Sequence, residues 1–434
     1  MIKIVHITAH MGGGVGRILS NIAIYSKNEN EVEHIIITLE PTKTNQFEKL
    51  CKENNINVFL AENCDINNIL NGADIVQLDW WHHPIISQFM INCLERVKCR
   101  LVVWSHISGC SYPNIFPEFV FSPEAFVFTT PYSYENISWT HNEREQIIEK
   151  SSIVVSSGID IDKPVKKKSH FGFNVGYIGF LSYNKMHPNF VKYCENACNI
   201  PGIRFIVVGD KSYGKQLIKD VCKSKILRNK VIFTGYSLNV LEDLERFDVF
   251  GYPLNPNHYG TAENVLLEAM AAGIVPVVLN QCTEKYIVEN MKTGLVVNNI
   301  SEYVSALRWL YENPHQRHIL GNNASEYIVK EYNIKSTIKK MNNVYGKVLN
   351  NNKKLHDFTS IFGETPYDWF LSCYKGDINN IKGIAFAETK GSVKHYLKYF
   401  IQDKKLKKIV DINERRIKYE HNLNVKKLDE NSHK

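Results

Sequence analysis

The sequence lacks the patterns that mark secreted, membrane-spanning and zinc-binding proteins. Its ten cysteines include no CxxC pair, and no His–Cys array has the spacing of a zinc site. No stretch approaches the roughly 18 apolar residues that a membrane-spanning helix needs. The segment Met1–Arg17 has no uninterrupted apolar run of the kind found in signal peptides. We therefore expect free thiols in a reducing cytoplasm and no bound metal.

An excess of charge of one sign is also missing. The formal net charge is only +7 over 434 residues, so we do not expect nucleic acid as a partner. Phosphorylated substrates or an anionic surface would suit this mild positive excess. Because a single core rarely grows beyond about 250–300 residues, the length predicts two large domains and a smaller element.

Short β-branched runs alternate with longer amphipathic segments, which indicates an α/β protein with parallel sheets covered by helices. The polar stretch Asp162–His170 separates two such series, so the sequence predicts two Rossmann-like domains. The expected strands are Ile2–Thr8, His34–Leu39, Asp74–Leu78, Leu101–Trp104, Ala125–Thr129, Ile153–Val155, Phe173–Ile178, Arg204–Val208, Val231–Thr234, Val249–Tyr252 and Val275–Val278. The expected helices include Arg17–Ser26, Asn45–Glu53, Asn264–Ala272, Ser301–Glu312 and Ile334–Leu349.

The predicted domains cover residues 1–165 and 166–350, and residues 351–434 form a C-terminal extension of unknown role. The extension interleaves aromatic residues with lysines, which fits either a satellite core or contact with an anionic membrane face. Its last part, Lys404–Lys434, reads as a charged and largely solvated tail. The aromatic residues concerned are Tyr367, Trp369, Phe370, Tyr396, Tyr399 and Phe400.

A glycine-rich segment, Met11–Arg17, follows the first expected strand and opens a helix. Its glycines, among them Gly13 and Gly14, would let backbone N–H groups approach an anion at the helix start. A purely structural tight turn is the alternative. The spacing is not GxGxxG, and Glu40 is the nearest acidic residue to the end of the second strand, which argues against a dinucleotide oxidoreductase.

Three side chains of the second half have candidate roles in binding a nucleotide. Lys185 lies in a loop after a strand and either pairs with a diphosphate or is a surface lysine. Glu263 lies where a loop enters a helix. Glu268 sits on that helix among apolar neighbours, where a buried carboxylate needs donors such as the two hydroxyls of a ribose; a capping or solvent-facing glutamate is the alternative. The leading amides of the helix, at Asn264 and Val265, could hold a phosphate.

Residues 260–278 resemble the nucleotide-sugar motif of retaining family-4 glycosyltransferases of the GT-B fold, also called glycosyl transferases group 1. In that motif a glutamate, seven residues and a second glutamate precede Ala-Met-Ala-x-Gly-x-Pro-Val-Val, and Glu268 matches the second glutamate. The resemblance covers about residues 1–345. It also rests on Ser157–Asp160, Val207–Asp210, Val231–Tyr236 and Thr293–Val296, which resemble the family's interdomain link, glycine turn, nucleobase loop and following strand.

Two positions depart from the family pattern. Gly260 stands where the family has its first glutamate, so we expect Glu263 to take over that contact to the donor sugar from one helical turn later. Phe180 stands where the family often has an arginine, five residues before Lys185. Diphosphate binding would therefore depend more on Lys185 and on backbone amides.

The resemblance implies roles in the first half of the chain as well. His106 resembles the histidine that reaches the donor sugar, and a histidine merely packed at a strand end is the alternative. Trp80, Trp81 and His82 end a strand, where they either stack on acceptor sugars or pack in the core. The catalytic candidates are His106, Lys185 and Glu263; the donor-binding candidates are Gly13, Gly14, Lys185, Gly209, Tyr236, Asn264, Val265 and Glu268; the acceptor-binding candidates are Trp80, Trp81 and His82.

The expected architecture is GT-B, with the two domains facing each other across a cleft. The expected activity is transfer of a hexose or similar sugar, with retention, from a nucleotide-diphosphate sugar to a glycan or lipid-linked acceptor. No DxD-type carboxylate pair is evident, so no metal or other cofactor is expected. Many enzymes that this chain resembles build lipopolysaccharide, O-antigen or capsule at the cytoplasmic face of the inner membrane. A nucleotide-sugar epimerase of the same fold and a non-catalytic nucleotide-sugar-binding protein are the alternatives.

Overall fold

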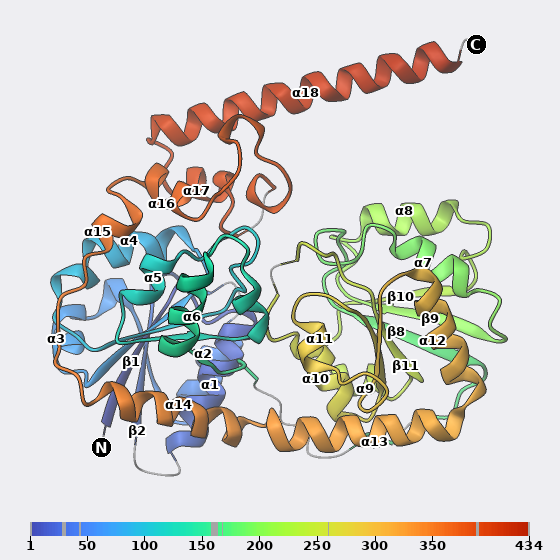
Figure 1. The fold of residues 1–434 in the computed structure, drawn as a ribbon, viewed down its shortest axis with the longest axis horizontal. Helices are drawn as coiled ribbons and strands as arrows, with labels where there is room; N and C mark the ends of the chain where they lie inside the picture. Colours follow the sequence, from blue (N-terminus) through green and yellow to red (C-terminus); the bar gives the residue numbers. More distant parts are fainter. Residues whose placement is uncertain are drawn as a thin grey trace. The chain divides into compact units, whose positions relative to one another are not determined.

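The computed structural model describes residues 2–27, 32–42, 45–157, 164–166, 168–258, 260–387 and 390–432, with residues 421–432 as backbone only (Figure 1). The chain forms two compact units. The first comprises Met1–Phe128, Ser133–Ser152 and Val344–Lys434, and the second comprises Thr129–Tyr132 and Ile153–Asn343. Of the expected interdomain link, Ser157 is described, whereas Gly158, Ile159 and Asp160 lie outside the described residues.

The first unit is built on a seven-stranded sheet in the order β3-β2-β1-β4-β5-β6-β7. β1 pairs in parallel with β2 on one side and β4 on the other, as the alternation of strands and helices predicts. The strands are β1 (Ile2–Thr8), β2 (Val32–Thr38), β3 (Asn57–Leu60), β4 (Ile75–Trp80), β5 (Leu101–Ser105), β6 (Ala125–Phe128) and β7 (Ser152–Ile153). The helices are α1 (Gly13–Lys27), α2 (Gln46–Glu53), α3 (Ile66–Asn71), α4 (Pro84–Asn92), α5 (Pro117–Phe121) and α6 (His141–Lys150).

The glycine-rich segment differs from the expected loop. Helix α1 begins at Gly13, four residues earlier than the expected start at Arg17, so Gly13, Gly14 and Gly16 lie in its first turns. A Cβ added at Gly16 would lie 2.2 Å from the Met11 carbonyl oxygen, which explains the need for a glycine there. Gly13 and Gly14 are exposed at the helix start.

The second unit is built on a six-stranded sheet in the order β10-β9-β8-β11-β12-β13. Its strand order reverses at β8, as in other doubly wound sheets. The strands are β8 (Phe173–Ile178), β9 (Ile203–Val208), β10 (Val231–Gly235), β11 (Val249–Tyr252), β12 (Val275–Leu279) and β13 (Leu295–Val297). The helices are α7 (Phe190–Ala197), α8 (Lys215–Lys223), α9 (Val240–Leu244), α10 (Asn264–Ala271), α11 (Glu284–Ile287), α12 (Ile300–Glu312) and α13 (Pro314–Glu331), and α14 (Ile334–Val348) runs on into the first unit.

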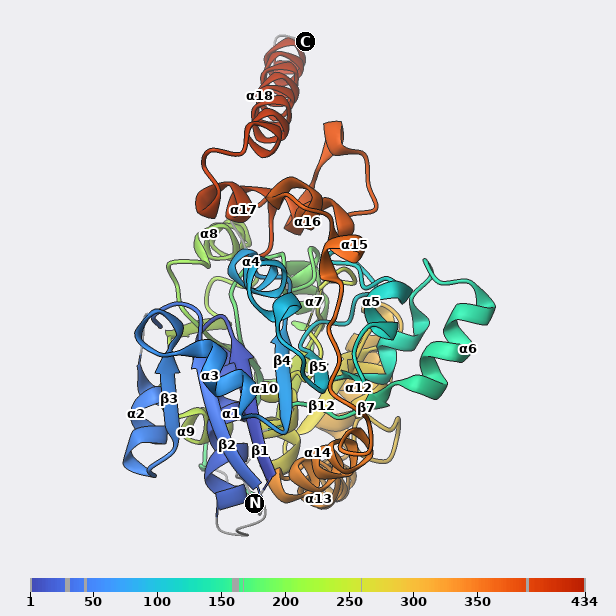
Figure 2. The same ribbon diagram turned by 90° about the vertical axis from the view of Figure 1, so that its left-hand side faces the viewer.

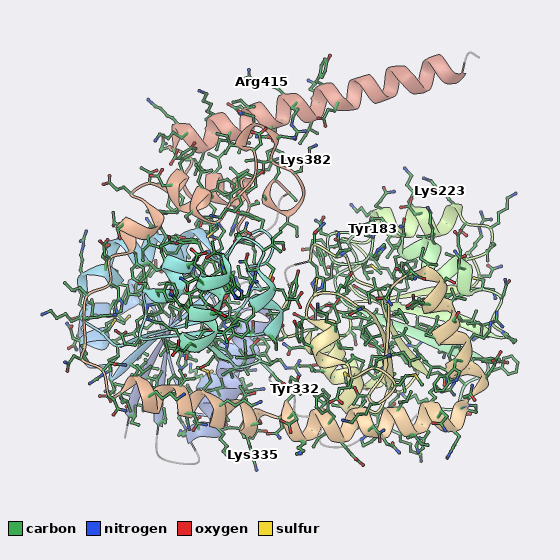
Figure 3. The ribbon with its side chains drawn as sticks, in the orientation of Figure 1. Tyr183, Lys223, Tyr332, Lys335, Lys382 and Arg415 are labelled. Carbon is green, nitrogen blue, oxygen red and sulfur yellow. The ribbon has the colours of Figure 1, made fainter. Side chains whose placement is uncertain are left out.

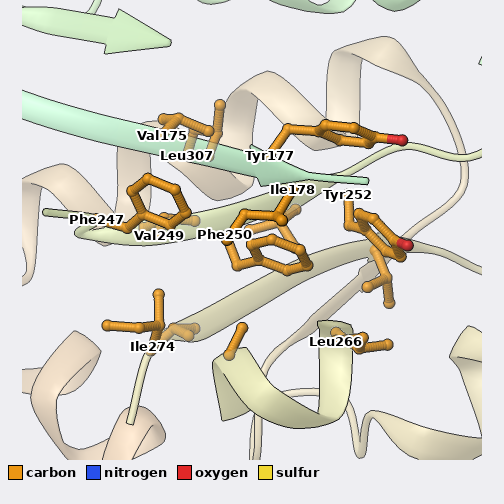
Figure 4. Close-up of a cluster of buried hydrophobic side chains, with 14 of the residues drawn as sticks. Val175, Tyr177, Ile178, Phe247, Val249, Phe250, Tyr252, Leu266, Ile274 and Leu307 are labelled. Atoms are coloured by element: carbon orange, nitrogen blue, oxygen red, sulfur yellow. The ribbon is translucent and has the colours of Figure 1, made fainter. Parts of the chain in front are cut away.

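The core of the second unit lies between these strands and helices (Figure 4). Phe247 packs against β8 so closely that a Cβ at Gly176 would lie 2.0 Å from its ring. Tyr177 and Tyr252 are both buried, and Figure 4 shows their hydroxyl groups at the same end of the neighbouring strands β8 and β11. This end is the carboxyl edge of the sheet.

The C-terminal extension packs on the first unit (Figure 2). It contains α15 (Phe358–Phe362), α16 (Pro366–Ser372), α17 (Val393–Tyr399) and α18 (Lys404–Ser432). Helices α16 and α17 contact both α4 and α18, so they lie between the body of the first unit and the last helix.

The structure corrects the expected tail and favours the satellite-core alternative for the aromatic residues. Lys404–Ser432 is one long helix, and Leu406, Ile409 and Val410 bury one side of its first half. Trp369, Phe370 and Tyr396 are buried, so they cannot face a membrane. Exposed charged side chains remain on α18, including Arg415, which is labelled in Figure 3. Among the described residues, no helix combines the length and the apolar character needed to cross a bilayer.

Candidate functional site

Several candidate side chains of the second unit gather at the carboxyl edge of its sheet. Lys185 lies in the loop that follows β8, Tyr252 is the last residue of β11, and Glu263 directly precedes α10. Open α/β sheets bind ligands at this edge because the loops that leave the strands meet there.

Lys185 and Glu263 form an ion pair. The Lys185 Nζ lies 2.5 Å and 2.6 Å from the two carboxylate oxygens of Glu263. The Tyr252 hydroxyl donates a second hydrogen bond, 2.9 Å long, to Glu263 Oε2. Glu263 is 7% exposed, and its backbone adopts a left-handed conformation with φ of 43°. A non-glycine residue in this conformation is strained, and such strain often accompanies function.

The neighbour that makes room for this carboxylate is Gly260. A Cβ added at Gly260 would lie 1.9 Å from Glu263 Oε1 and 2.7 Å from Lys185 Nζ. The carboxylate of residue 263 therefore occupies the space that a glutamate at residue 260 would enter. The substitution of Glu263 for the family's first glutamate stays a prediction, for which this geometry leaves room.

The electrostatics of the pair keep Glu263 ionised. Burial alone would raise the pKa of this carboxyl, but Lys185 and the other groups around it outweigh burial and hold the pKa below its ordinary value. Burial and the nearby carboxylate raise the pKa of Tyr252 well above its usual range, so its phenol stays a donor.

A second buried group supports the loop that carries Gly260. The Gly260 N–H donates to His258 Nδ1 at 3.1 Å, and His258 Nε2 lies 3.1 Å from both oxygens of the Glu284 carboxylate. Burial alone would lower the pKa of His258, but the Glu284 carboxylate raises it to about 9, and Nε2 donates its proton to that carboxylate. His258 and Glu284 thus fix the loop backbone at Gly260.

Helix α10 presents the other donor-binding candidates of this edge. Asn264 and Val265 are its first two residues, so their N–H groups have no acceptor within the helix. Glu268 lies one turn further on and is only 3% exposed. Its side chain therefore lies inside the unit and not in bulk water. A carboxylate that binds a ribose would need such a position.

Aromatic side chains surround the same edge. Phe180 follows β8, and its ring lies 4.8 Å from that of Tyr213, in the loop after β9. Tyr236 follows β10 and is 73% exposed. Gly209 lies so close to the loop after β8 that a Cβ there would be 2.2 Å from the Gly179 carbonyl oxygen. Gly209 is therefore needed for packing, whereas Tyr236 is available to a flat ligand.

In the first unit, the structure separates the expected acceptor-binding residues. Trp80 is completely buried and packs on Phe119, with ring centroids 5.0 Å apart. His82 is also completely buried and contacts Tyr396 of the extension. Only Trp81 is partly exposed. Burial therefore favours the alternative of core packing for Trp80 and His82: Trp80 ends β4 facing the core, and the left-handed turn at His82 directs its ring beneath α17.

His106 lies directly after β5 and joins a buried carboxylate. Its Nε2 lies 2.9 Å from Asp79 Oδ1, at the end of the neighbouring strand β4. Asp79 is completely buried, whereas 6% of the His106 side chain is exposed. An aspartate behind a histidine at a strand edge is an arrangement that can orient an imidazole and stabilise a proton on it.

Two groups of side chains contain the residue types that bind metals: His10, Glu40 and His83, and His258, Cys282 and Glu284. In both groups a histidine Nδ1 accepts a backbone N–H; His10 accepts from Gly12 and His83 from Ile85. On His83 the ring proton is then on Nε2, where a metal would need a lone pair, whereas His10 Nε2 lies 2.8 Å from the Lys390 ammonium. His83 instead faces Glu40 at 3.4 Å, and Tyr399 donates to the same carboxylate.

A match to a known protein family falls within the second unit. Residues 159–327 match the family model of glycosyl transferases group 1. This glycosyl transferases group 1 domain contains Lys185, Gly260, Glu263 and Glu268. No curated protein matches the chain by sequence.

Solved glycosyltransferases share the fold of about four fifths of this chain. HepE from Anabaena, solved with UDP and glucose, has a TM-score of 0.62 and 15% identity over 80% of this chain and 100% of its own. A glycosyltransferase from Rickettsia africae has a TM-score of 0.63 and 14% identity over 81% and 99%. Sucrose-phosphate synthase from Thermosynechococcus elongatus has a TM-score of 0.61 and 14% identity over 80% and 99%. The fold is therefore GT-B, as expected.

Sequence reasoning missed several polar residues around these sites. Tyr252 and His258 contact Glu263 and its loop, and Asp79 contacts His106. Tyr252 was missed because an aromatic residue at the end of an apolar strand is expected to be a core residue. A polar exception inside an apolar run, such as His6 in β1, could have indicated buried polar neighbours such as Asp79.

Proposed function

We propose that the chain is a glycosyltransferase that transfers a hexose or similar sugar, with retention, from a nucleotide-diphosphate sugar to a glycan or lipid-linked acceptor. One observation carries the proposal. The Glu263 carboxylate lies beside Lys185, in the space that a side chain at residue 260 would enter. The group 1 domain would then keep a carboxylate and a cation at the donor site, although the glutamate stands at residue 263 and not at residue 260.

The proposed roles follow from the positions of these groups. Lys185 has three donors, so it can keep Glu263 and still contact a diphosphate. The leading amides of α10, at Asn264 and Val265, add partial positive charge where the leaving group becomes negative. Glu268 would accept the hydroxyls of the ribose, and Tyr236 would lie against the base. Gly13 and Gly14, at the start of α1, stay predictions as donor-binding residues.

In the proposed reaction, the bond between the sugar C1 and the diphosphate oxygen breaks, and the acceptor oxygen bonds to C1 from the same face. The acceptor proton passes to the departing phosphate oxygen, so a nucleoside diphosphate and the glycosylated acceptor are the products. No metal is required in this scheme because Lys185 and the helix amides stabilise the departing charge.

The donor can be identified by a thermal-shift screen against UDP, GDP, CDP and ADP sugars. A ligand at about 100 times its Kd should stabilise the protein by roughly 2.7 kcal/mol. UDP sugars are the first choice because HepE was solved with UDP and glucose. Stabilisation by none of the four classes would contradict the proposal. Conversion of the donor to an isomer without an acceptor would indicate an epimerase, and binding with neither transfer nor hydrolysis would indicate a non-catalytic protein.

Two variants and a matched control locate the binding site. Glu268→Gln and Lys185→Ala should abolish the ligand-induced stabilisation. Lys292→Ala is the control, because Lys292 also pairs with a glutamate at 2.6 Å, Glu289, but on the exposed surface. Ligand-induced stabilisation in Lys185→Ala equal to that of the control would place the donor elsewhere.

We also propose that the acceptor belongs to lipopolysaccharide, O-antigen or capsule synthesis at the cytoplasmic face of the inner membrane. One structural neighbour is the lipopolysaccharide outer core galactosyltransferase WaaB, with a TM-score of 0.55 and 15% identity over 80% of this chain and 100% of its own. The first half of α18 exposes six basic side chains, which suits an anionic surface. They are Lys404, Lys405, Lys407, Lys408, Arg415 and Lys418.

Vesicle sedimentation tests the membrane contact. The protein should sediment with vesicles that contain phosphatidylglycerol and should be released by salt, because exposed charges are screened. It should stay in solution with phosphatidylcholine vesicles. Replacing the six basic residues by glutamine should abolish sedimentation, and unchanged sedimentation of that variant would reject this surface.

A further inference from the structure

A cluster of histidines and a lysine lies where the C-terminal extension packs on the first unit. His10 follows β1, and Trp81 and His83 follow β4, so all three stand at the carboxyl edge of the sheet. The extension adds Lys390 and His395 from more than 300 positions later in the chain. The Lys390 Nζ lies 2.8 Å from His10 Nε2, and the His395 ring lies 4.8 Å from that of His83.

The backbone assigns the protons on the three imidazole rings. Each Nδ1 atom accepts an N–H group of the chain: His10 from Gly12 at 3.0 Å, His83 from Ile85 at 3.3 Å and His395 from Gly391 at 2.9 Å. A neutral ring that accepts on Nδ1 carries its hydrogen on Nε2. Each of the three rings therefore presents an Nε2–H donor.

The donor on His10 meets another donor. Its Nε2–H points at the ammonium of Lys390, which has no lone pair to offer. The other tautomer does not remove the conflict, because an Nδ1–H would then meet the N–H of Gly12. With either tautomer, one donor beside His10 lacks an acceptor on the ring. Lys390 has a further interaction of its own, but an ammonium carries three hydrogens and can keep it while binding a ligand.

The charges of the cluster favour an anion. Burial and the Lys390 charge lower the pKa of His10 to about 4. Burial, Lys390 and Lys398 lower the pKa of His395, also to about 4. Both rings are therefore uncharged near neutral pH, and Lys390 stands beside them as a cation. An anion at this place would be attracted by Lys390 and would accept a hydrogen bond from His10 Nε2.

The neighbouring carboxylate of Glu40 already has donors of its own. Tyr399 donates to its Oε2, and His83 Nε2 lies 3.4 Å from its Oε1. A Glu40 oxygen lies within 4.8 Å of a His10 nitrogen, yet the pKa of His10 is lowered. Glu40 therefore does not offset the Lys390 charge at His10.

The cluster is open to a ligand. Lys390 is exposed, and His10, Trp81 and His395 are partly exposed. The Trp81 ring stands edge-on to that of His10, with centroids 5.6 Å apart. An aromatic side chain next to hydrogen-bond donors offers a surface on which a sugar ring can pack.

The extension is anchored directly beside Lys390. Tyr112 donates a hydrogen bond to the Gly391 carbonyl oxygen. A Cβ added at Gly391 would lie only 3.1 Å from the His82 carbonyl oxygen, and the backbone there is left-handed with φ of 82°. These contacts place Lys390 at the edge of the sheet.

We propose that Lys390 and His10 bind an oxyanion, a phosphate or a carboxylate, on the acceptor sugar, and that His395 adds a donor beside them. The sugar ring would pack on Trp81, and the C-terminal extension would thereby select the acceptor. That the oxyanion belongs to an acceptor rests on the proposed glycosyltransferase function. The oxyanion site itself does not, so inorganic phosphate can test it alone.

Thermal melting of the full chain in inorganic phosphate, at constant ionic strength, tests the site. Phosphate should stabilise the native chain to saturation. Lys390→Gln and His10→Gln should each need about tenfold more phosphate for the same shift, because a hydrogen bond to an ion is lost. Lys390→Arg keeps the charge and should still bind. Lys382→Gln is the control, because Lys382 is an exposed lysine of the same extension (Figure 3).

The comparison with the variants is needed because phosphate also stabilises proteins by exclusion from their surface. Exclusion acts on all variants alike, so only the difference between them reports binding. Equal shifts in the native chain, Lys390→Gln and His10→Gln would overturn the proposal.

Nuclear magnetic resonance of protein labelled with 15N-histidine locates the bound phosphate. The Nε2 signal of His10, assigned from the variant H10Q, should shift as phosphate is added at constant pH. Phosphate should also raise the pKa of His10 from about 4, because an anion favours the charged ring. The signal of His141, whose side chain is 85% exposed, should stay in place. Saturation without a shift of His10 would mean an adventitious ion only and would overturn the proposal.

Sugar ligands identify the oxyanion. Glucose 6-phosphate and glucuronate present a phosphate and a carboxylate on a sugar ring. One of them should bind more tightly than inorganic phosphate, and Trp81→Ala should remove this advantage because the ring loses its packing surface. The tighter ligand names the oxyanion. Weaker binding of both than of inorganic phosphate would reject an oxyanion carried by a sugar.

UDP and lipid vesicles test the two other sources of phosphate. Saturating UDP should leave the phosphate affinity unchanged, and loss of phosphate binding would assign the site to the donor and overturn the proposal. Lys390→Gln should sediment with phosphatidylglycerol vesicles like the native chain, and loss of sedimentation would assign the site to a lipid headgroup instead. Phosphate binding at His10 without binding of any nucleotide sugar would refute the proposed function and leave the oxyanion site standing. The reverse result would refute the oxyanion site alone.

Discussion

The carboxylate of Glu263 fills the space in which a side chain at Gly260 would begin. The distance from a Cβ at residue 260 to Glu263 Oε1 would be 1.9 Å, which no real pair of atoms adopts. A side chain at residue 260 would therefore have to displace the Glu263 carboxylate from its place beside Lys185.

This steric conflict predicts the behaviour of a swap. Gly260→Glu alone should lose donor binding and at least 2 kcal/mol of stability, because overpacking a buried site typically costs about 1–3 kcal/mol and the new carboxylate meets Glu263. The double variant Gly260→Glu with Glu263→Gly should recover much of both, since glycine also relieves the left-handed backbone at residue 263. Thermal melting with and without donor measures each variant. A double variant no better than Gly260→Glu would contradict the proposed equivalence.

Removing Lys185 should destabilise the second unit beyond the loss of a surface ion pair. Lys185→Ala leaves the carboxylate of Glu263, 7% exposed, without its cation, which we expect to cost about 3 kcal/mol in urea unfolding. Lys185→Ala combined with Glu263→Gln should cost less than the single variant because no buried charge remains. Lys292→Ala, which breaks an exposed pair, should change stability by less than about 1 kcal/mol. Equal losses in Lys185→Ala and Lys292→Ala would show that the Lys185 pair does not contribute.

Mild acid should destabilise the first unit through His82 and His83. Burial lowers the pKa of His82 to about 3 and, with neighbouring cations, that of His83 to about 2. A histidine in the unfolded chain has a pKa of 6.5. Below this pH the unfolded chain binds protons that the native chain does not, so the stabilisation from the two neutral rings is present above pH 6.5 and is lost as the pH decreases. The loss between pH 6.5 and 5.5 should be about 2 kcal/mol for the two groups.

Urea unfolding at several pH values checks this slope. His83→Gln should reduce the loss between pH 6.5 and 5.5 by about 1 kcal/mol, whatever its effect at neutral pH. His141→Gln is the control, because 85% of the His141 side chain is exposed. A native slope that His83→Gln leaves unaltered would mean that other groups cause the acid sensitivity.

Two truncations of the chain should differ in their effect on stability. A chain that ends at Asn350 loses Phe362, which packs on Phe116 and Phe119 with ring centroids 5.4 Å and 4.9 Å away. It also loses the two hydrogen bonds from Thr359 to Glu95. We expect this truncation to be insoluble or to melt at a lower temperature. A chain that ends at Glu420 should melt like the full chain, and a soluble, native-like product ending at Asn350 would show that the extension is an independent addition.

The sequence alone predicted the sheets well because buried parallel strands read as β-branched runs. Ile2–Thr8, Phe173–Ile178 and Val249–Tyr252 have the bounds expected for them. β3 was missed because Asn57–Leu60 lies at the edge of its sheet and is short and half exposed. Helix α1 was expected to start too late because its first turn consists of glycines, which have poor intrinsic helix propensity.

The site was predictable only as far as single motifs reach. Lys185 and Glu263 were singled out separately, but 78 positions separate them in the chain, and only the folded structure brings them together. The burial of Trp80 and His82 depends on Phe119 and on Tyr396, which lies more than 300 positions away. The spacing of residues within a motif does not indicate contacts between residues that are so far apart in the sequence.

The return of the chain from the second unit to the first has a consequence for biosynthesis. A ribosome completes Ile153–Asn343, nearly the whole second unit, in one stretch, so this unit can fold as soon as it emerges. The first unit must wait, because Gln77 receives its hydrogen bond from Tyr345 and α4 is covered by α16 and α17. The half of the protein that is translated first is therefore the half that is finished last, and the cover of α4 is complete only when the nascent chain is almost full length.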